Sequence, residues 1–392
     1  MATNLLKLKT QKIPTLRFPG FLGEWEEKRL KDVASIERGR FSPRPRNNPK
    51  YYGGKIPFVQ TGDVVKSGGI IKDYTQTLND EGLKVSKLFT KGSILITIAA
   101  NIGYTGILDI DMACPDSLIG IKCKDDTDNV FLNYYLSTQQ VRMDRIASQA
   151  AQKNINIEFL KPYKIFWTSL AEQQKIAGFL SVTDEWIGNL RTQKKFLEKY
   201  RKGMMQKIFA QEFRFKNDDG NDFGEWEEKD FLSVFKSIST KSHQIKNSEI
   251  LQNGDYKVVD QSMDLVAGYS NKKDMIFDNI PVIVFGDHTT ILKYVDFNFI
   301  VGADGTKILN TNTKENNLKF LYYLLQSDPV STEGYKRHYS ILKSRNLFAP
   351  HLDEQQKIAE FLTAIDNLIE SKQQQITQAE LWKKGLMQGL FV

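Results

Sequence analysis

The segment "EQQKIAGFLSVTDEWIGNLRTQKKFLEKYRKGMMQKIF" spans Glu172–Phe209, and "EQQKIAEFLTAIDNLIESKQQQITQAELWKKGLMQGLF" spans Glu354–Phe391. The two segments align without a gap at an offset of 182 positions, and 17 of their 38 paired residues are identical. Both lack proline and repeat apolar residues at spacings of three and four, which is typical of a long helix with one apolar stripe. The sequence therefore predicts two long, related helices as the frame of the fold.

A second repeat opens each half of the chain. "GEWEEK" occurs at Gly23–Lys28 and again at Gly224–Lys229. A related tripeptide precedes each copy, namely "LRF" at Leu16–Phe18 and "FRF" at Phe213–Phe215. Repeats of this kind indicate that one structural plan occurs twice in tandem.

The segments between these repeats differ from each other in length and in sequence. They alternate β-branched and apolar residues between glycine-rich turns, as in "GSILITIAANIGYTGILDI" and "NIPVIVFGD", and each ends in a helical stretch. We predict an α+β protein with four parts: an N-terminal arm and first variable domain (1–165), a central helix (166–210), a linker and second variable domain (211–349), and a C-terminal helix (350–392).

The apolar stripes of the two helices predict a coiled coil. Because a whole domain separates the helices in sequence, we expect them to pair antiparallel, giving a pseudo-twofold arrangement. The alternative is that each helix packs only on its own domain. With Ile176 taken as heptad position a, the predicted seam includes two glutamines that would fix the register. Its residues are Ile176, Phe179, Trp186, Leu190, Gln193, Leu197, Ile358, Phe361, Ile365, Leu368, Gln375 and Trp382.

Composition narrows the class of protein. The 392 residues carry a formal net charge of +7, which favours a polyanionic partner such as nucleic acid. The two cysteines are too few for a disulfide framework and favour free thiols in a reducing cytoplasm. No apolar run approaches the roughly 18 residues that a membrane-spanning helix needs, and we expect no membrane partner.

The strongest charge feature is "RGRFSPRPRNNPKYYGGK" (Arg38–Lys55), in which basic and aromatic residues alternate without any acidic residue. Arginine suits both phosphate contact and bidentate contact with guanine. The alternative is a solvated basic loop. Together with weaker polar segments, the candidate DNA-binding residues are Arg38, Arg40, Arg44, Arg46, Lys50, Tyr51, Tyr52, Gln152, Lys153, Asn154, Lys272, Lys273, His288, Lys336, Arg337, His338 and Lys343.

Motifs for catalysis are missing from the sequence. It contains neither a GxxxxGK[ST] phosphate loop nor a GxGxxG turn after a strand. Its four histidines lack metal-ligand spacing, and His288 has no nucleophile suggested beside it, so a structural or DNA-contacting role is favoured over a catalytic base. We therefore predict no catalytic residue, no metal site and no enzyme activity in this chain.

The duplicated frame resembles the specificity subunit of Type I restriction-modification systems. The resemblance rests on "LRFPGFLGEWEEKRL" (Leu16–Leu30), the paired "EQQKIA" helices and the two unlike middle domains, and it covers nearly the whole chain. "KIPFVQTGDV" and "FGDHT…GADGTKIL" are also similar to stretches common in that family.

The resemblance implies two globular target-recognition domains separated by an antiparallel coiled coil. Each domain would read one half of a split, asymmetric site in double-stranded DNA, and the helices would set the unread gap. Two modification subunits would bring S-adenosylmethionine to methylate adenine. Restriction subunits, which are translocase-nucleases, would join for cleavage, and ATP and Mg would also bind to partner subunits. The alternatives are a stand-alone DNA-modifying enzyme and a protein scaffold that does not bind DNA.

Overall fold

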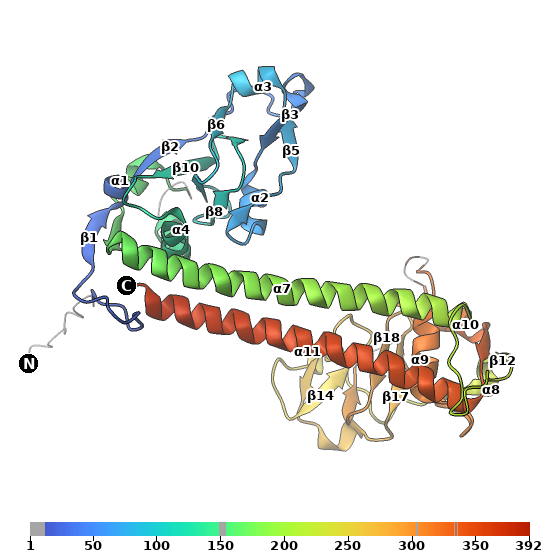
Figure 1. The fold of residues 1–392 in the computed structure, drawn as a ribbon. Helices are drawn as coiled ribbons and strands as arrows, with labels where there is room; N and C mark the ends of the chain where they lie inside the picture. The colour runs from blue at the N-terminus through green and yellow to red at the C-terminus, as the bar shows by residue number, and fades with distance from the viewer. Residues whose placement is uncertain (1–11, 149–153, 303–304, 333, 335) are drawn as a thin grey trace, which may run out of the picture. The chain divides into compact units, whose positions relative to one another are not determined.

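The computed structural model describes residues 12–148, 154–302, 305–332, 334 and 336–392 (Figure 1). The two predicted long helices are present as α7 (Leu170–Phe209) and α11 (Leu352–Leu390). The chain divides into two compact units, and each long helix contributes residues to both. Unit 1 comprises residues 1–190 and 375–392, whereas unit 2 comprises residues 191–374.

Unit 1 contains a domain built on two mixed β-sheets. One sheet has the strand order β2-β10-β7-β8-β4, and the other has the order β5-β3-β9-β6. All four residues of β7 are buried, as expected for an apolar strand covered on both faces. The strands are β2 (Ala34–Arg38), β3 (Tyr52–Phe58), β4 (Ile70–Ile71), β5 (Gln76–Leu78), β6 (Lys87–Phe89), β7 (Ile94–Thr97), β8 (Thr105–Leu108), β9 (Met112–Cys114) and β10 (Leu118–Cys123).

The helices of this domain are short except for one pair near its carboxyl end. That pair is α4 and α5, and α4 places six consecutive buried residues against the core. The helices are α1 (Leu30–Val33), η1 (Pro49–Tyr51), α2 (Thr61–Lys66), α3 (Asp80–Lys84), α4 (Asn129–Thr138), α5 (Gln140–Ser148) and α6 (Ile157–Leu160).

Unit 2 contains a second α+β domain with the same kind of core but fewer strands. Its sheets have the orders β13-β20-β17-β18 and β15-β14-β19-β16. The elements are α8 (Phe231–Val234), β13 (Phe235–Ile238), η2 (Asn247–Glu249), β14 (Tyr256–Val259), β15 (Gly268–Ser270), η3 (Lys273–Met275), β16 (Ile276–Phe277), β17 (Val282–Gly286), β18 (Leu292–Val295), β19 (Phe299–Val301), β20 (Thr306–Thr311), α9 (Leu318–Ser327) and α10 (Tyr339–Lys343).

Each domain is joined to a long helix by an equivalent two-stranded sheet. In unit 1, β1 (Glu26–Arg29) pairs antiparallel with β11 (Lys164–Trp167), and α7 follows directly. In unit 2, β12 (Glu227–Asp230) pairs antiparallel with β21 (Asn346–Ala349), and α11 follows. The "GEWEEK" repeat supplies the first strand of each pair, so the predicted duplication is confirmed.

The long helices pair antiparallel within each unit. In unit 1, Ile187 and Leu190 form a buried cluster with Ile376 and Ala379. Earlier residues of α7, such as Leu180, share the unit 1 core with later residues of α11, such as Leu390. The residue numbers therefore rise along one helix as they fall along the other. The predicted antiparallel coiled coil is confirmed.

The same direction holds in unit 2. Arg201 of α7 forms an ion pair with Asp366 of α11. Nearer the end of α7, Ile208 shares a buried cluster with Ile358, near the start of α11. Each half of one helix thus packs on the opposite half of the other.

The seam of this coiled coil has a different frame from the predicted one. Ile176 and Leu190 are buried as expected, but the second row of buried residues contains Leu180 and Ile187 rather than Phe179 and Trp186. On α11, Ile358 and Ile365 are buried, and the second row is Leu362 and Ile376. Ile176 therefore takes heptad position d. The next seam residue, Leu180, follows it after four positions, whereas the predicted frame placed the next one after three.

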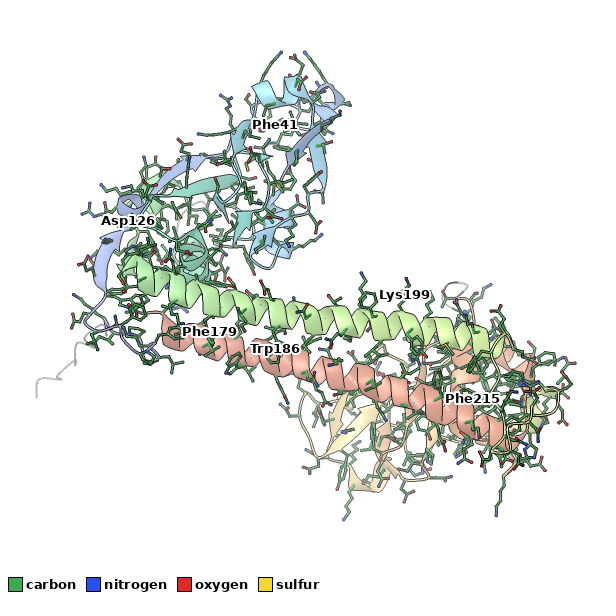
Figure 2. All side chains as sticks on the ribbon, in the orientation of Figure 1. Phe41, Asp126, Phe179, Trp186, Lys199 and Phe215 are labelled. Atoms are coloured by element: carbon green, nitrogen blue, oxygen red, sulfur yellow. The ribbon has the colours of Figure 1, made fainter. Side chains whose placement is uncertain are left out.

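Several residues predicted for the seam consequently lie beside it. Trp186, Leu368 and Trp382 are each about half exposed, and Gln193 and Gln375 are exposed as well. Leu197, Phe179 and Phe361 are intermediate. The physical reason is size, because branched aliphatic side chains fit between the helices while the broad indole rings pack along the flank. The ring centroids of Trp186 and Trp382 are 6.3 Å apart (Figure 2 labels Trp186).

The repeated glutamate of "EQQKIA" explains why three separate sequence repeats occur together. Glu172 is buried and accepts two hydrogen bonds from Arg17 of the "LRF" tripeptide, at 2.8 and 2.9 Å. The same guanidinium donates to the carbonyl oxygen of Gly23, which opens "GEWEEK". A bidentate guanidinium–carboxylate pair is a strong, directional contact. One joint therefore fastens the arm, the first strand and the long helix.

Unit 2 repeats this joint with its own residues. Arg214 of "FRF" donates to both carboxylate oxygens of Glu354, at 3.1 and 2.7 Å. It also donates to the carbonyl oxygen of Gly224 at 2.6 Å. The three repeats of the sequence are thus the three parts of one contact, formed once in each unit.

The first glutamine of "EQQKIA" attaches the domain helix to the long helix. Gln173 accepts a hydrogen bond from the backbone N–H of Asp128, the N-cap residue of α4, at 3.0 Å. In unit 2, Gln355 accepts from the N–H of Asn317, the N-cap residue of α9, at 2.9 Å. Each glutamine satisfies a backbone donor at the start of a domain helix, which has no partner within that helix.

Candidate nucleic-acid interface

The predicted basic loop lies between β2 and β3 and carries a small aromatic core of its own. Phe41 is buried, and its ring lies within 6.1 Å of the rings of Tyr51, Tyr52 and Phe58, measured between centroids. The hydroxyl of Tyr52 donates to the backbone carbonyl of Arg46 at 2.5 Å. Tyr51 and Tyr52 are therefore half-buried and shape the loop, although parts of their rings remain accessible.

Arginines of this loop are bonded within the domain. Arg38 Nε donates to the Asp116 carbonyl oxygen at 2.7 Å, and Arg40 donates to the Ser86 carbonyl oxygen at 2.8 Å. Arg46 donates to both carboxylate oxygens of Asp116, at 2.7 and 2.8 Å. These contacts hold the loop against the segment between β9 and β10 and against Ser86, just before β6. They also reduce the number of donors left for DNA.

The loop still presents positive charge to solvent. The side chains of Arg44 and Arg46 are 59% and 48% exposed. Lys50 is exposed too, with its Nζ 5.8 Å from the centroid of the Tyr51 ring. This arrangement suits contacts with phosphates, which require exposed cations but no fixed base-reading geometry.

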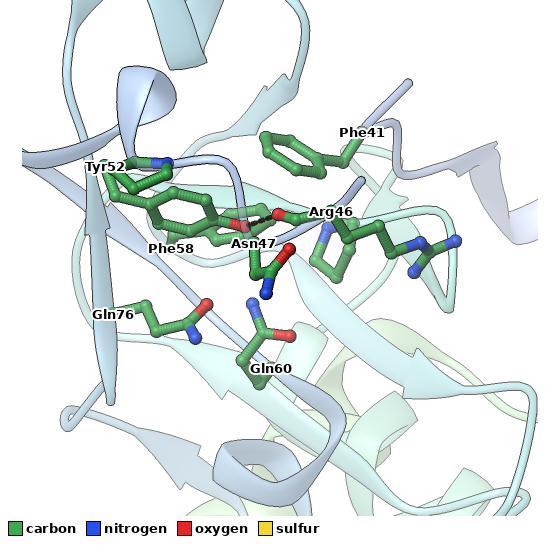
Figure 3. A pocket seen from close by; sticks show the side chains of 9 residues that line it. Phe41, Arg46, Asn47, Tyr52, Phe58, Gln60 and Gln76 are labelled. Carbon is green, nitrogen blue, oxygen red and sulfur yellow. Dashed lines mark hydrogen bonds between the residues drawn. The ribbon is translucent and has the colours of Figure 1, made fainter. Parts of the chain in front are cut away.

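A pocket of about 440 Å³ opens beside the loop (Figure 3). Rings of Phe41, Tyr52 and Phe58 form its apolar side, and side-chain amides face them. The amides belong to Asn47, Gln60 and Gln76. None of these three amides was predicted from the sequence. Asn47 lies within the basic loop and Gln60 and Gln76 lie at strand ends, where a single amide carries no signal that distinguishes it from a solvated residue.

The other candidates of unit 1 come from the segment before α6. Gln152 and Lys153 lie outside the described residues. Asn154 is exposed, and its backbone forms an isolated β-bridge with Ala99. The next residue, Ile155, donates its N–H to the Ile98 carbonyl oxygen at 3.1 Å. The segment is thus fixed next to the end of β7.

In unit 2, the structure brings three of the candidates together in a polar cleft of about 650 Å³. His288, Lys336 and Arg337 line this cleft. His288 Nδ1 lies 3.2 Å from the Lys336 carbonyl oxygen. Two further lining residues, Lys307 and Gln244, were missed in the sequence. Lys307 is the second residue of β20 and ends the "GADGTK" sequence, so the glycines of that sequence could have drawn attention to it.

His338 is fully buried, which rules out a direct contact with DNA. Its Nδ1 lies 3.1 Å from the carbonyl oxygen of Asp287, and the His338 N–H donates to the same oxygen at 2.8 Å. The alternation of basic and aromatic residues around it suggested an exposed position, but the histidine instead fastens the start of α10 to the end of β17.

The remaining candidates of unit 2 are separate from the cleft lining. Lys272 forms an ion pair with Glu249, and Lys273 begins η3. Lys343 is exposed at the end of α10, with its Nζ 5.2 Å from the Tyr339 ring centroid. Such single surface cations contribute to a general field rather than to a defined contact.

Groups suited to chemistry are sparse in the described part of the chain. Among those residues, no three or more His, Cys, Asp or Glu side chains are placed so that they could hold a metal ion. Both cysteines are free thiols, and burial raises the pKa of the Cys123 thiol to about 12. In the same described part, no helix is both long and apolar enough to cross a membrane.

Comparison with known proteins gives a consistent result along both halves of the chain. A family model described as the Type I restriction modification DNA specificity domain matches twice, at residues 23–199 and 224–381. The two matches cover one domain and most of one long helix each.

Relatives of the same kind match most of the chain. The putative type I restriction enzyme MjaX specificity subunit of Methanocaldococcus jannaschii is 26% identical over 400 residues, covering 93% of this chain and 92% of the relative. The MjaVIII specificity subunit from the same organism is 29% identical over 294 residues, covering 66% and 68%.

The fold also matches a solved specificity subunit. The S subunit of a Type I restriction-modification system from M. genitalium superposes with a TM-score of 0.62 at 18% identity, covering 97% of this chain and 99% of that one. The duplicated domains, the paired helices and these matches lead to one conclusion: the chain belongs to the Type I restriction-modification specificity subunits and carries two DNA specificity domains.

Proposed function

We propose that this chain reads a bipartite, asymmetric site in double-stranded DNA, one half with each domain. The observation that supports this most directly is the difference between the two candidate surfaces. Unit 1 offers an aromatic and amide pocket beside a basic loop, whereas unit 2 offers a cleft lined by His288, Lys307 and Arg337. Two unlike surfaces on a duplicated frame suit the reading of two unlike half-sites.

In this proposal the chain is a recognition subunit without a catalytic centre. It directs two adenine methyltransferase subunits to the site, and translocase-nuclease subunits join them for cleavage. S-adenosylmethionine, ATP and Mg bind to those partners. The assembly works in the cytoplasm, where it meets cellular DNA.

Exchange of one domain tests whether the two readers are independent. We would replace residues 30–165 with the corresponding segment of another specificity subunit and sequence the methylated adenines in a host that also carries the methyltransferase. One half of the methylated motif should change, and the other half should persist. A change in both halves would contradict independent reading.

The coiled coil is proposed to set the length of the unread gap. Each long helix is continuous through both units, so one extra heptad in each helix adds about 10 Å. At 3.4 Å per base pair, the gap should lengthen by about three base pairs. Insertions between Leu190 and Arg191 and between Gln374 and Gln375 fall at the boundary of the units. A methylated motif with its old spacing would refute this function of the helices.

Two other functions make different predictions in a simple binding assay. A stand-alone DNA-modifying enzyme would methylate or cut DNA without partners, and a protein scaffold would shift no DNA under any condition. The proposed recognition subunit shifts its specific DNA most strongly when the methyltransferase subunit is present, and it leaves the DNA unmodified when alone. A gel-shift and methylation assay with and without the partner separates these three outcomes.

A further inference from the structure

The pocket beside the basic loop combines flat apolar walls with amide groups on a rigid frame. Phe58 is the last residue of β3 and pairs in register with Gln76, the first residue of β5. Phe41 and Phe58 are both buried, with ring centroids 5.0 Å apart. Of the nine lining residues, Tyr52, Phe58 and Gln76 lie on the paired strands β3 and β5, which fix this side of the pocket.

Gln60 gives the pocket an unsatisfied donor. Its backbone N–H donates to the Asp63 carboxylate at 2.8 Å, which fixes the residue at the start of α2. Its side-chain Nε2 is buried and has no hydrogen-bond partner among the described residues. A buried donor without a partner destabilises the folded state until a ligand or water accepts its hydrogen bond. Figure 3 shows this amide directed to the same space as those of Asn47 and Gln76.

The lining selects for a flat, neutral ring that both donates and accepts hydrogen bonds. Each amide offers two donors and an acceptor oxygen, as the edge of a nucleobase requires. A phosphate would need free cations, but Arg46, the charged residue of the lining, is already paired with Asp116. Tyr52 is half-buried, and the buried rings of Phe41 and Phe58 support it from behind. Its ring can stack only on a base that has left the double helix, since a paired base exposes only its edges in the grooves.

We propose that this pocket holds one unpaired base of the half-site read by unit 1, with Gln60 and Gln76 bonded to its Watson–Crick edge. This inference rests on the proposed function, since it requires a bound DNA duplex. Proteins that hold a base in this way bind more readily where the pair is already broken, because part of the unpairing cost is removed.

Scanning the half-site tests the inference with the unaltered protein. The complex of this chain with its methyltransferase would bind duplexes carrying, at one position at a time, a mismatch or an abasic site. At one position, we expect a mismatch to leave affinity unchanged or to raise it severalfold, whereas an abasic site lowers it about tenfold. Specific binding in which no position behaves this way would overturn the inference and leave the proposed function intact.

Variants locate the base in this pocket. Gln60→Leu combined with Gln76→Leu removes the amides at similar volume and should weaken binding of the intact duplex about tenfold. The abasic site at the identified position should then cause no further loss, because both changes remove the same contact. Gln174→Leu, at an exposed position of α7, serves as the control and should leave affinity unchanged.

Three outcomes would count against the inference or against its premise. If the abasic site and the double variant each lower the affinity and their effects multiply when combined, the two changes act independently and the base lies elsewhere. Competition by free adenosine or thymidine at the affinity of the duplex would make the pocket a nucleoside site. A complex that binds no DNA sequence in preference to another would refute the proposed function itself.

Discussion

At the scale of single residues, the buried glutamates of the two "EQQKIA" repeats, Glu172 and Glu354, each bind the arginine that precedes the "GEWEEK" strand of the same unit. Glu354 is fully buried and its partner Arg214 is largely so, with 22% of the side chain exposed. Burial removes solvent from both charges, so each is stabilised mainly by the other. Both repeats carry glutamate at this position because the carboxylate pairs with a largely buried arginine. This role is structural and requires no contact with DNA.

Replacing Glu354 by Gln should lower the free energy of unfolding by about 3 kcal/mol, because the guanidinium of Arg214 would lose its counter-charge. Urea unfolding followed by tryptophan fluorescence measures this change. Glu360→Gln, at an exposed position of the same helix, is the control and should alter stability by less than about 0.5 kcal/mol. If the two substitutions lowered the free energy of unfolding equally, the pair of Glu354 and Arg214 would contribute no more to stability than an exposed glutamate.

Cys123 gives a residue-level prediction about pH. Burial, and to a smaller extent the Asp128 carboxylate, raise the pKa of this thiol from 9.0 to about 12. The folded chain therefore keeps a proton that the unfolded chain loses above pH 9. Stability from this group is complete below pH 9 and is lost as the pH rises towards 12. Cys123→Ser should make the decline of unfolding free energy over this range shallower; an unchanged slope would contradict the assignment.

Residue roles were the part of the molecule that sequence predicted least well. Arg38–Lys55 is a basic and aromatic loop as predicted, but Asp116, which binds Arg46, lies 70 positions further along the chain. No local pattern reveals such a partner. His338 likewise carries no local sign of burial, because the hydrogen bonds that hold it come from Asp287, which follows β17 and lies 51 positions earlier in the chain.

At the scale of elements, the long helices were predicted closely, whereas the seam frame was not. Phe179 and Leu180 are adjacent apolar residues, as are Trp186 and Ile187, so two heptad frames fit the sequence almost equally well. Packing decides between them, because the space between two helices accepts aliphatic side chains more readily than indole rings. The antiparallel direction was predicted from the domain that separates the two helices in sequence, so it did not depend on the choice of heptad frame.

The choice of frame can be measured with two neighbouring substitutions. Ile187 is 4% exposed and Trp186 is 47% exposed. Ile187→Ala should lower the free energy of unfolding by about 2–4 kcal/mol, since it leaves a cavity beside Leu190 and Ile376. Trp186→Ala, although it removes a larger side chain, should cost less. Thermal or urea unfolding compares the two, and the reverse order of effects would restore the frame that places Trp186 in the seam.

At the scale of the whole molecule, the two units differ in one connection. In unit 2, the chain turns continuously from α7 into the "FRF" segment, and the Phe213 N–H donates to the Lys207 carbonyl oxygen at 3.1 Å. In unit 1, the equivalent residues are Leu16 and Gly389, and the Leu16 N–H donates to the Gly389 carbonyl oxygen at 2.8 Å. The same turn is therefore formed once with a covalent link and once without it.

A circular permutant should consequently fold. Joining Val392 to Ile13 through a short glycine-serine linker and opening the chain between Gln211 and Glu212 moves the covalent link from the unit 2 turn to the unit 1 turn. The hydrogen-bonding groups of both turns remain in the chain. We expect the circular dichroism spectrum and the methylated motif to be retained. A permutant opened at Gly188, inside α7, is the control and should fail to fold. Loss of structure in the first permutant would show that the covalent turn of unit 2 is required.

The hydrogen bond between Leu16 and Gly389 also bears on how such genes can rearrange. This turn forms with or without a peptide link between the two segments. The fold therefore does not require that the two halves of the gene be encoded in one particular order. A recombination event that moved the second half ahead of the first would still encode both domains.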